Sequence, residues 1–322
     1  MENYNMKKKE ILKFKYKNSG QSIKFPVGTV YGKKDGPTLV VLGGMHGSEF
    51  CGIQGAIDLF NEIKPEELRG TLIVGTIYNM PAFLNHTGFV IPLDGKNPMS
   101  TFPGKLDGTY GEVMAYHFYN KVISKANYFV ELHGGDIPES LTPFVVCLKT
   151  GDQKVDQVIN DMAMVYNIPL VITRSIVPEE KLGAAFRKTA LSGIPAILAE
   201  SGQQGILKEE DAKVHLDGLK NIMIKLNMID GEIIDTTNRT ILEYHGAIRN
   251  ETPGMWYPFV KLNQRVVKDE VVGEIRDYFG DHLVDIKAPI DGIVTVIRTS
   301  PSVGMSNVLV ELHHVLKTIS KN

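Results

Sequence analysis

The stretch Pro37–Glu49 (PTLVVLGGMHGSE) decides how this chain folds. It begins with apolar and β-branched residues that suit a buried parallel strand, and a helical apolar period starts soon after its glycines. It therefore predicts a strand that turns sharply into a helix. His46 and Glu49 stand in this turn, at the carboxyl end of the strand. Because ligands bind at that edge of open α/β sheets, these two side chains are candidates for half of a zinc site.

The third candidate ligand lies at the end of a second apolar stretch, Tyr128–Gly135 (YFVELHGG). Two parallel strands can each deliver a side chain at the same edge of a sheet, so His133 can meet His46 and Glu49. Two histidines and one glutamate form the ligand set of hydrolytic zinc sites, which keep a fourth position open for water. Strand alternation puts Glu131 on the face of His133, where it could orient the imidazole from behind.

Other interpretations of these two stretches are weaker. The glycine-rich turn has neither the GxGxxG nor the GxxxxGK[ST] pattern of a phosphate-binding loop. A single histidine is more often structural than metal-binding, but a paired glutamate and a second strand ending in His-Gly-Gly favour ligands here. The remaining histidines have no such context: His86, His117, His215, His245, His282, His313 and His314.

Composition indicates an ordinary globular protein. The chain has 322 residues and a formal net charge of −2, which gives no reason to expect nucleic acid or membrane surfaces as partners. No apolar run is long enough to span a bilayer, and the N-terminus lacks a secretory signal, so we expect a cytoplasmic protein. Lys7–Lys9 are expected to be a solvated flank, and Cys51 and Cys147 to be buried thiols.

The order of elements predicts an α/β fold in which helices cover both faces of a mostly parallel sheet. Expected helices at 110–126 and 208–226 are the clearest, and the irregular stretch 79–110 is long enough to suggest a functional loop. We expect this α/β domain to span residues 1–232. Its predicted strands lie at 38–43, 71–78, 128–133, 144–148, 170–173 and 196–200.

A second, smaller domain is expected at 233–322. Short apolar runs broken by turn residues predict an all-β module there, without helices. Val266–Ile275 and Ile286–Val294 resemble the turns of biotinyl and lipoyl carrier domains, which are barrel-sandwich folds. No lysine stands at a matching hairpin tip, so we expect a β cap over the site that excludes polypeptides, and not a carrier of a prosthetic group.

Three motifs together resemble the succinylglutamate desuccinylase and aspartoacylase family, relatives of the zinc carboxypeptidases. The family's G-x-H-G-x-E motif is matched by Gly44–Glu49, and its strand ending in Leu-His by Leu132-His133. Its late Gly-Ile-Pro-Ala…Glu-x-Gly pattern is matched by Gly193–Gly202 (GIPAILAESG). The resemblance implies a zinc carboxypeptidase-like fold, one Zn²⁺ per chain, and Glu200 as the catalytic carboxylate.

The chain departs from the family in the long loop. The family pattern Asp-Gly-x-x-Leu-Asn-Arg-x-Phe-Pro-Gly is replaced by Asp94–Gly104 (DGKNPMSTFPG), so Met99 and Ser100 stand where an Asn-Arg pair would hold the substrate, and His86 replaces an upstream arginine. A serine cannot replace a bidentate arginine. Either the leaving amine lacks a carboxylate, which we favour, or another basic residue binds it; the candidates are Lys96, Arg174 and Arg187.

The sequence thus predicts a zinc-dependent amidohydrolase acting on a small N-acyl amino acid or N-acyl amine. His46, Glu49 and His133 are expected to hold the metal, and Glu200 to move the proton. The alternatives are a carboxypeptidase for short peptides and a non-catalytic metal- or metabolite-binding protein. Homo-oligomers are possible.

Overall fold

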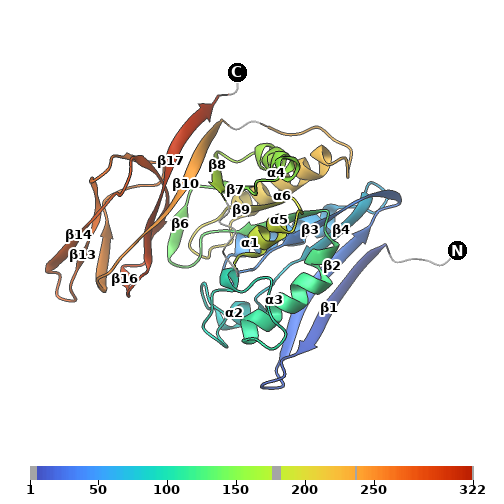
Figure 1. Ribbon diagram of the computed structural model, residues 1–322, viewed down its shortest axis with the longest axis horizontal. Coiled ribbons are helices and arrows are strands. Elements are labelled where there is room, and N and C mark those ends of the chain that lie inside the picture. The colour runs from blue at the N-terminus through green and yellow to red at the C-terminus, as the bar shows by residue number, and fades with distance from the viewer. Residues whose placement is uncertain (1–5, 176–182, 236–237, 321–322) are drawn as a thin grey trace.

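One large sheet forms the centre of the molecule (Figure 1). The computed structural model describes residues 6–175, 183–235 and 238–320, and within them this sheet has 13 strands. Residues 7–200 supply β1 (Lys7–Lys15), β2 (Ser22–Tyr31), β3 (Lys34–Leu42), β4 (Arg69–Gly75), β5 (Tyr128–His133), β6 (Glu139–Leu141), β7 (Phe144–Lys149), β8 (Leu170–Ser175) and β9 (Ala196–Glu200).

The sheet is mixed, with a parallel centre. Its order begins β1-β2-β4-β3-β5-β9-β7-β8, and every strand expected between 38 and 200 is present. The pairs β3–β4, β3–β5, β5–β9 and β7–β8 are parallel, as expected. The strand β7 runs antiparallel to β9, and the hairpin β1–β2 adds antiparallel strands at the edge. The apolar patterns of the sequence do not distinguish these directions.

Helices cover both faces of this sheet. Phe60 of the first helix fills the space beside Gly28, whereas Phe118 of the third lies beside Gly75. Gly75 is paired with Val27, the neighbour of Gly28, so the two helices lie on opposite faces. The two expected helices are confirmed as α3 and α6. The helices are α1 (Phe50–Glu62), α2 (Met80–Asn85), α3 (Tyr110–Lys121), α4 (Gln153–Val165), α5 (Ala185–Leu191) and α6 (Glu209–Lys225), with 3-10 turns η1 (Pro98–Ser100) and η2 (Ile123–Lys125).

The chain after residue 238 is built of strands, and half of them continue the main sheet. The strand β10 pairs with β8 in parallel and extends the main sheet, which continues through β17 and β15 to β12. The short strand β6 also pairs with β15. The order β14-β13-β11-β16 forms a second sheet around Trp256 (Figure 1, left). The boundary at 232/233 stays a prediction. These strands are β10 (Arg239–Arg249), β11 (Gly254–Pro258), β12 (Arg265–Val266), β13 (Val271–Arg276), β14 (His282–Lys287), β15 (Gly292–Arg298), β16 (Ser302–Val303) and β17 (Val308–Ile319).

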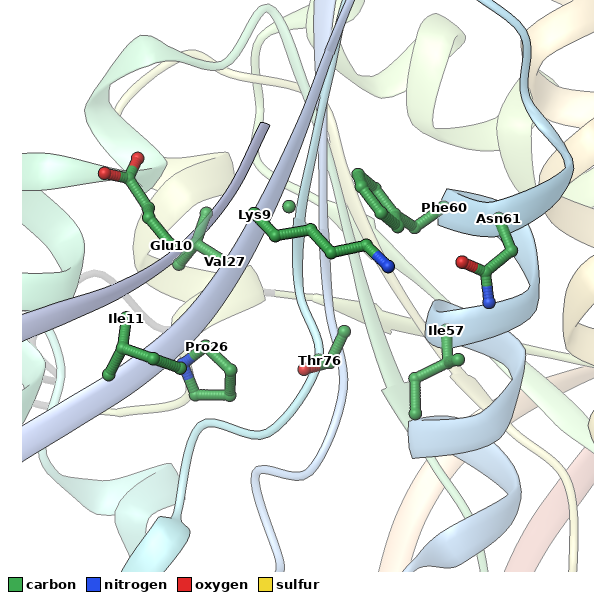
Figure 2. Close-up of a pocket in the computed structure, with 10 residues that line it drawn as sticks. Lys9, Glu10, Ile11, Pro26, Val27, Ile57, Phe60, Asn61 and Thr76 are labelled. Carbon is green, nitrogen blue, oxygen red and sulfur yellow. The ribbon is translucent and has the colours of Figure 1, made fainter. Parts of the chain in front are cut away.

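The N-terminal lysines are largely solvated, as expected, but they belong to a strand. Lys7–Lys9 begin the edge strand β1, where lysines hinder pairing with another sheet edge. A hollow of about 400 Å³ separates this hairpin from α1, and the ammonium of Lys9 lies over the ring of Phe60 at 5.5 Å (Figure 2). Cys51 and Cys147 are buried, as expected. None of the helices described is long and apolar enough to cross a membrane.

His215 of α6 makes stability depend on pH. The side chain is buried; its Nε2 donates to the carbonyl oxygen of His133 at 2.8 Å, and its Nδ1 accepts from the Tyr166 hydroxyl at 3.0 Å. Burial lowers the pKa of His215 to about 4. The folded protein therefore keeps this imidazole neutral, whereas the unfolded chain takes up a proton below about pH 6.5.

We expect this one histidine to remove about 2 kcal/mol from the free energy of unfolding between pH 7 and pH 5. His215→Gln should be less stable at pH 7, because it loses packing and hydrogen bonds, but its stability should fall less on acidification. Urea unfolding of both proteins at the two pH values measures the difference. Equal losses in both proteins would contradict a neutral buried His215.

Candidate metal centre

Two strand ends bring three predicted ligands together. His46 and Glu49 follow β3, and His133 ends β5, the strand paired with it. The Nδ1 atom of His46 lies 2.6 Å from Glu49 Oε1, and Nδ1 of His133 lies 2.8 Å from Glu49 Oε2. All three side chains are buried, and their ligand atoms lie within 4.8 Å of one another.

The far nitrogen of each imidazole has its own acceptor. His133 Nε2 donates to Glu131 Oε1 at 3.0 Å, and the other oxygen of Glu131 accepts from the backbone N–H of Phe186 at 2.7 Å. His46 Nε2 donates to Asn97 Oδ1 at 3.2 Å. Because these acceptors hold a proton on Nε2, each Nδ1 is the atom that would bind a cation beside Glu49, in place of the proton it shares with that carboxylate. Glu131 lies where the sequence places it, whereas Asn97 was not expected.

The turn that carries His46 is held by tight contacts. Gly44 has φ +64°, and a Cβ on Gly47 would lie 2.2 Å from the backbone nitrogen of Phe83, so α2 packs directly on the turn. Asp136, buried just beyond His133, joins this turn to the loop after α2. It accepts hydrogen bonds from the Ser48 hydroxyl and, at 2.7 Å, from the N–H of Phe89.

The donors suit a divalent cation. Burial opposes a charge on Glu49, but His46 and His133 outweigh it and hold the pKa of this carboxyl at about 2. Burial in turn lowers the pKa of His46 and His133, yet Glu49 raises both above the usual value, so protons and a cation would compete for the cluster. One carboxylate and two imidazoles match the preferences of zinc. Both oxygens of Glu49 thus face an imidazole nitrogen, which is the arrangement that a shared cation would bridge.

Glu200 lies beside the cluster. In the parallel pairing of β5 with β9 it is the direct partner of His133. Burial raises the pKa of Glu200 well above its usual range; His133 opposes this shift, and the carboxylates of Glu49, Glu139 and Glu311 add to it. Its Oε2 is buried without a hydrogen-bond partner among the described residues.

A cavity of about 680 Å³ joins this cluster to the C-terminal strands. His46, Glu49 and Glu200 line one side of it, and side chains from β10, β15 and β17 line the other. The cavity is large enough for a small organic molecule. Its charged lining combines carboxylates with four arginines, namely Arg174, Arg187, Arg249 and Arg298.

A family model for the succinylglutamate desuccinylase/aspartoacylase catalytic domain matches residues 35–226. The chain belongs to this family. Among curated proteins, it is 24% identical over 306 residues to N-alpha-acetyl-L-2,4-diaminobutyric acid deacetylase from Halomonas elongata; the match covers 92% of this chain and 88% of that protein.

Solved structures share the fold. The product-bound ectoine utilization protein EutE (DoeB) from Ruegeria pomeroyi superposes with a TM-score of 0.85 at 21% identity, covering 96% of this chain and 95% of that one. A succinylglutamate desuccinylase from Silicibacter sp. TM1040 gives a TM-score of 0.85 at 20% identity, covering 98% of this chain and 96% of that one. The mixed α/β architecture is therefore that of the family.

The loop residues that depart from the family pattern do not all reach the cavity. Met99 lines it, but Ser100 is exposed and its hydroxyl donates to the carbonyl of Asn97 at 2.7 Å. Lys96 pairs with Glu112 at 3.4 Å, and His86 is an exposed cap of α2 with φ 54°. Neither Lys96 nor His86 is among the residues that line the cavity.

Of the basic candidates, the structure brings Arg174 and Arg187 to the cavity, and the guanidinium of Arg174 lies 4.3 Å from the centre of the Tyr244 ring. No local pattern marks the lining residues of β6, β10, β15 and β17, because their position depends on pairing between distant strands. The residues missed in this way are Glu139, Tyr244, Arg249, Arg298, Glu311 and His313.

We expect Asn97 and Glu131, which accept hydrogen bonds from the Nε2 atoms of His46 and His133, to govern metal affinity. Asn97→Leu and Glu131→Gln should each weaken zinc binding about 10- to 100-fold, because the imidazoles lose their fixed orientation. Competition with a chromophoric chelator measures the affinity. Asn120→Leu, which removes an exposed amide on α3, is the matched control and should bind zinc like the parent protein. Unchanged affinity in both test variants would contradict these roles.

Proposed function

We propose that this protein is a zinc-dependent deacylase that hydrolyses the amide bond of a small N-acyl amino acid or N-acyl amine. The curated relative is named as a deacetylase of such a compound, and the family is named after two deacylases. His46, Glu49 and His133 would hold the metal. A cytoplasmic location, expected from the sequence, fits small soluble substrates of this kind.

Glu200 carries the proposal. Glu200 is partly buried, its pKa is raised, and its Oε2 is buried without a hydrogen-bond partner in the described chain, which is unfavourable unless the carboxylate has a task. Its place opposite His133 puts it at the metal cluster and at the cavity together. A carboxylate in this position can exchange protons with a substrate that lies in the cavity beside the metal cluster.

The mechanism divides between the metal and the chain. Bound zinc would act as a Lewis acid on the amide carbonyl and lower the pKa of water toward 7. Glu200 takes a proton from the attacking water and later gives it to the departing nitrogen. Its raised pKa keeps it closer to the working pH than an ordinary glutamate, as general acid-base catalysis requires. Glu131 and Asn97 keep the two imidazoles in the tautomer that leaves Nδ1 free for the metal.

Arginines that line the cavity can supply the positive charge that the family's loop arginine would provide. Met99 offers no charge and Ser100 points elsewhere, but Arg174 lines the cavity beside Tyr244. We therefore propose that Arg174 binds a substrate carboxylate, the explanation that the sequence had left second. The strands β10, β15 and β17 close the cavity on that side, so long peptides should be poor substrates.

Glu200→Gln should lower kcat by about 10²- to 10⁴-fold while zinc content stays at the parent level, because only proton transfer is lost. Release of primary amine from N-acetyl amino acids measures the rate, and metal analysis gives the zinc content. Glu210→Gln, an exposed position on α6, serves as control. Full activity in zinc-loaded Glu200→Gln would rule out the mechanism.

Arg174→Gln should raise KM for N-acetyl amino acids about tenfold or more and leave N-acetyl amines without a carboxylate nearly unaffected, since hydrogen bonds between charged groups are the strong ones. Steady-state kinetics with matched pairs of substrates gives the comparison. If the parent protein prefers the members without a carboxylate, the leaving amine differs from that of the family.

A further inference from the structure

Three strands form the wall of the cavity that faces the metal cluster. In the pairing of β6 with β15, Glu139 stands opposite Arg298 and Leu141 opposite Val296. In the pairing of β15 with β17, Val296 stands opposite Glu311. Since directly paired residues point to the same face of a sheet, these side chains share one surface, and all five line the cavity.

Glu139 and Glu311 bring two carboxylates to this wall. Among the residues that the structure describes, neither Glu139 nor Glu311 has a lysine or arginine within 4.0 Å, and the imidazole of His313, 3.8 Å from Glu311, is kept neutral because burial lowers its pKa to about 4. The nearby guanidiniums are otherwise engaged: Arg298 donates to the carbonyl oxygen of Ser302 at 3.1 Å.

The second nearby guanidinium also has a backbone partner, since Arg249 donates to the carbonyl oxygen of Ser306 at 2.9 Å. Arg249 and Arg174 act on Glu311 only from a distance, and burial still raises the pKa of this carboxyl. Burial raises the pKa of Glu139 well above its usual range, and the charges of Glu311, Glu49 and Asp136 push it in the same direction.

Such a pair is costly without a ligand. Both residues are partly buried, and taking carboxylates partly out of water in one another's field disfavours their charged form; a cation bound beside them would oppose both effects. The wall also faces the reacting groups, because Glu139 and Glu311 are close enough to influence Glu200. A substrate whose amide lies at Glu200 would therefore extend the rest of its amine portion toward the two wall carboxylates.

Resting on the deacylase function proposed above, we infer that Glu139 and Glu311 form a subsite for a second, protonated amino group of the substrate. The preferred substrates are then mono-N-acylated diamines or diamino acids. An ammonium group offers three donors, so it can serve more than one carboxylate acceptor. The arginines of the same cavity can take a carboxylate when the substrate has one, so the pocket suits a zwitterion.

Substrate pairs that differ only in the second amine test this subsite. The zinc-loaded protein is given Nα-acetyl-2,4-diaminobutyrate or Nα-acetyl-2-aminobutyrate, and N-acetylputrescine or N-butylacetamide. We expect kcat/KM to be about 10- to 100-fold higher for the member that carries the ammonium, as for other hydrogen bonds to charged groups. Equal or better turnover of the neutral members would overturn the inference.

Variants locate the effect. Glu139→Gln and Glu311→Gln should lower kcat/KM for the diamines about tenfold more than for the neutral members, because both kinds of substrate lose the same influence on Glu200 but only the diamines lose an ammonium contact. Their Tm should stay near that of the parent protein, because glutamine keeps the size of the side chain. Glu243→Gln, an exposed glutamate on β10, is the matched control. Equal slowing of both members of each pair would reduce the two residues to a structural role.

Binding provides a readout without turnover. Calorimetry with putrescine and butylamine, on zinc-loaded Glu200→Gln, should give tighter binding of putrescine. This difference should vanish in the triple variant Glu139→Gln/Glu311→Gln/Glu200→Gln.

Failure of the proposed function can be distinguished from failure of the subsite. If no N-acetyl compound is hydrolysed, or hydrolysis survives Glu200→Gln, the proposed function fails; if neutral amides are hydrolysed through Glu200 without a preference for diamines, only the subsite fails.

Discussion

The register of three parallel strands is the constraint on which the rest of this structure depends. The strands β3, β5 and β9 lie side by side, so the turn after β3, His133 at the tip of β5 and Glu200 at the tip of β9 meet at one edge of the sheet. A slip of one residue would turn each side chain to the other face. Buried apolar residues on both faces of these strands prevent such a slip, so the packing of the core and the geometry of the metal cluster have the same origin.

Much of the fold and the metal cluster could be predicted from local patterns. Strand ends followed by glycines identified His46, Glu49 and His133, because chemistry placed at a strand tip leaves a signal in neighbouring residues. Asn97 could have been found only by asking which residue accepts a hydrogen bond from Nε2 of His46. It lies in the irregular loop, where the sequence has no hydrophobic periodicity that would indicate the direction of its side chain. Glu311 and Arg298 lie on strands whose neighbours are set by long-range pairing, and no local pattern encodes which face of such a strand meets the cavity.

The cavity is lined by residues from two parts of the chain, the segment matched by the family model and the strands after it. The cluster and Glu200 lie within the segment matched by the family model, which ends at residue 226. Much of the facing wall comes from β10, β15 and β17, beyond that segment. Glu139 and Arg174, however, belong to the matched segment, so the lining of the cavity combines both parts of the chain.

The continuity of the main sheet across β8 and β10 also bears on biogenesis. Until β10 pairs with it, the outer edge of β8 has unsatisfied backbone groups, and the cavity lacks the side to which β17 contributes. During synthesis on the ribosome, the metal ligands thus emerge well before the strands that enclose them. A nascent chain can therefore bring the candidate ligands together before β17 completes the cavity, so the cluster and the closed cavity form at different moments of translation.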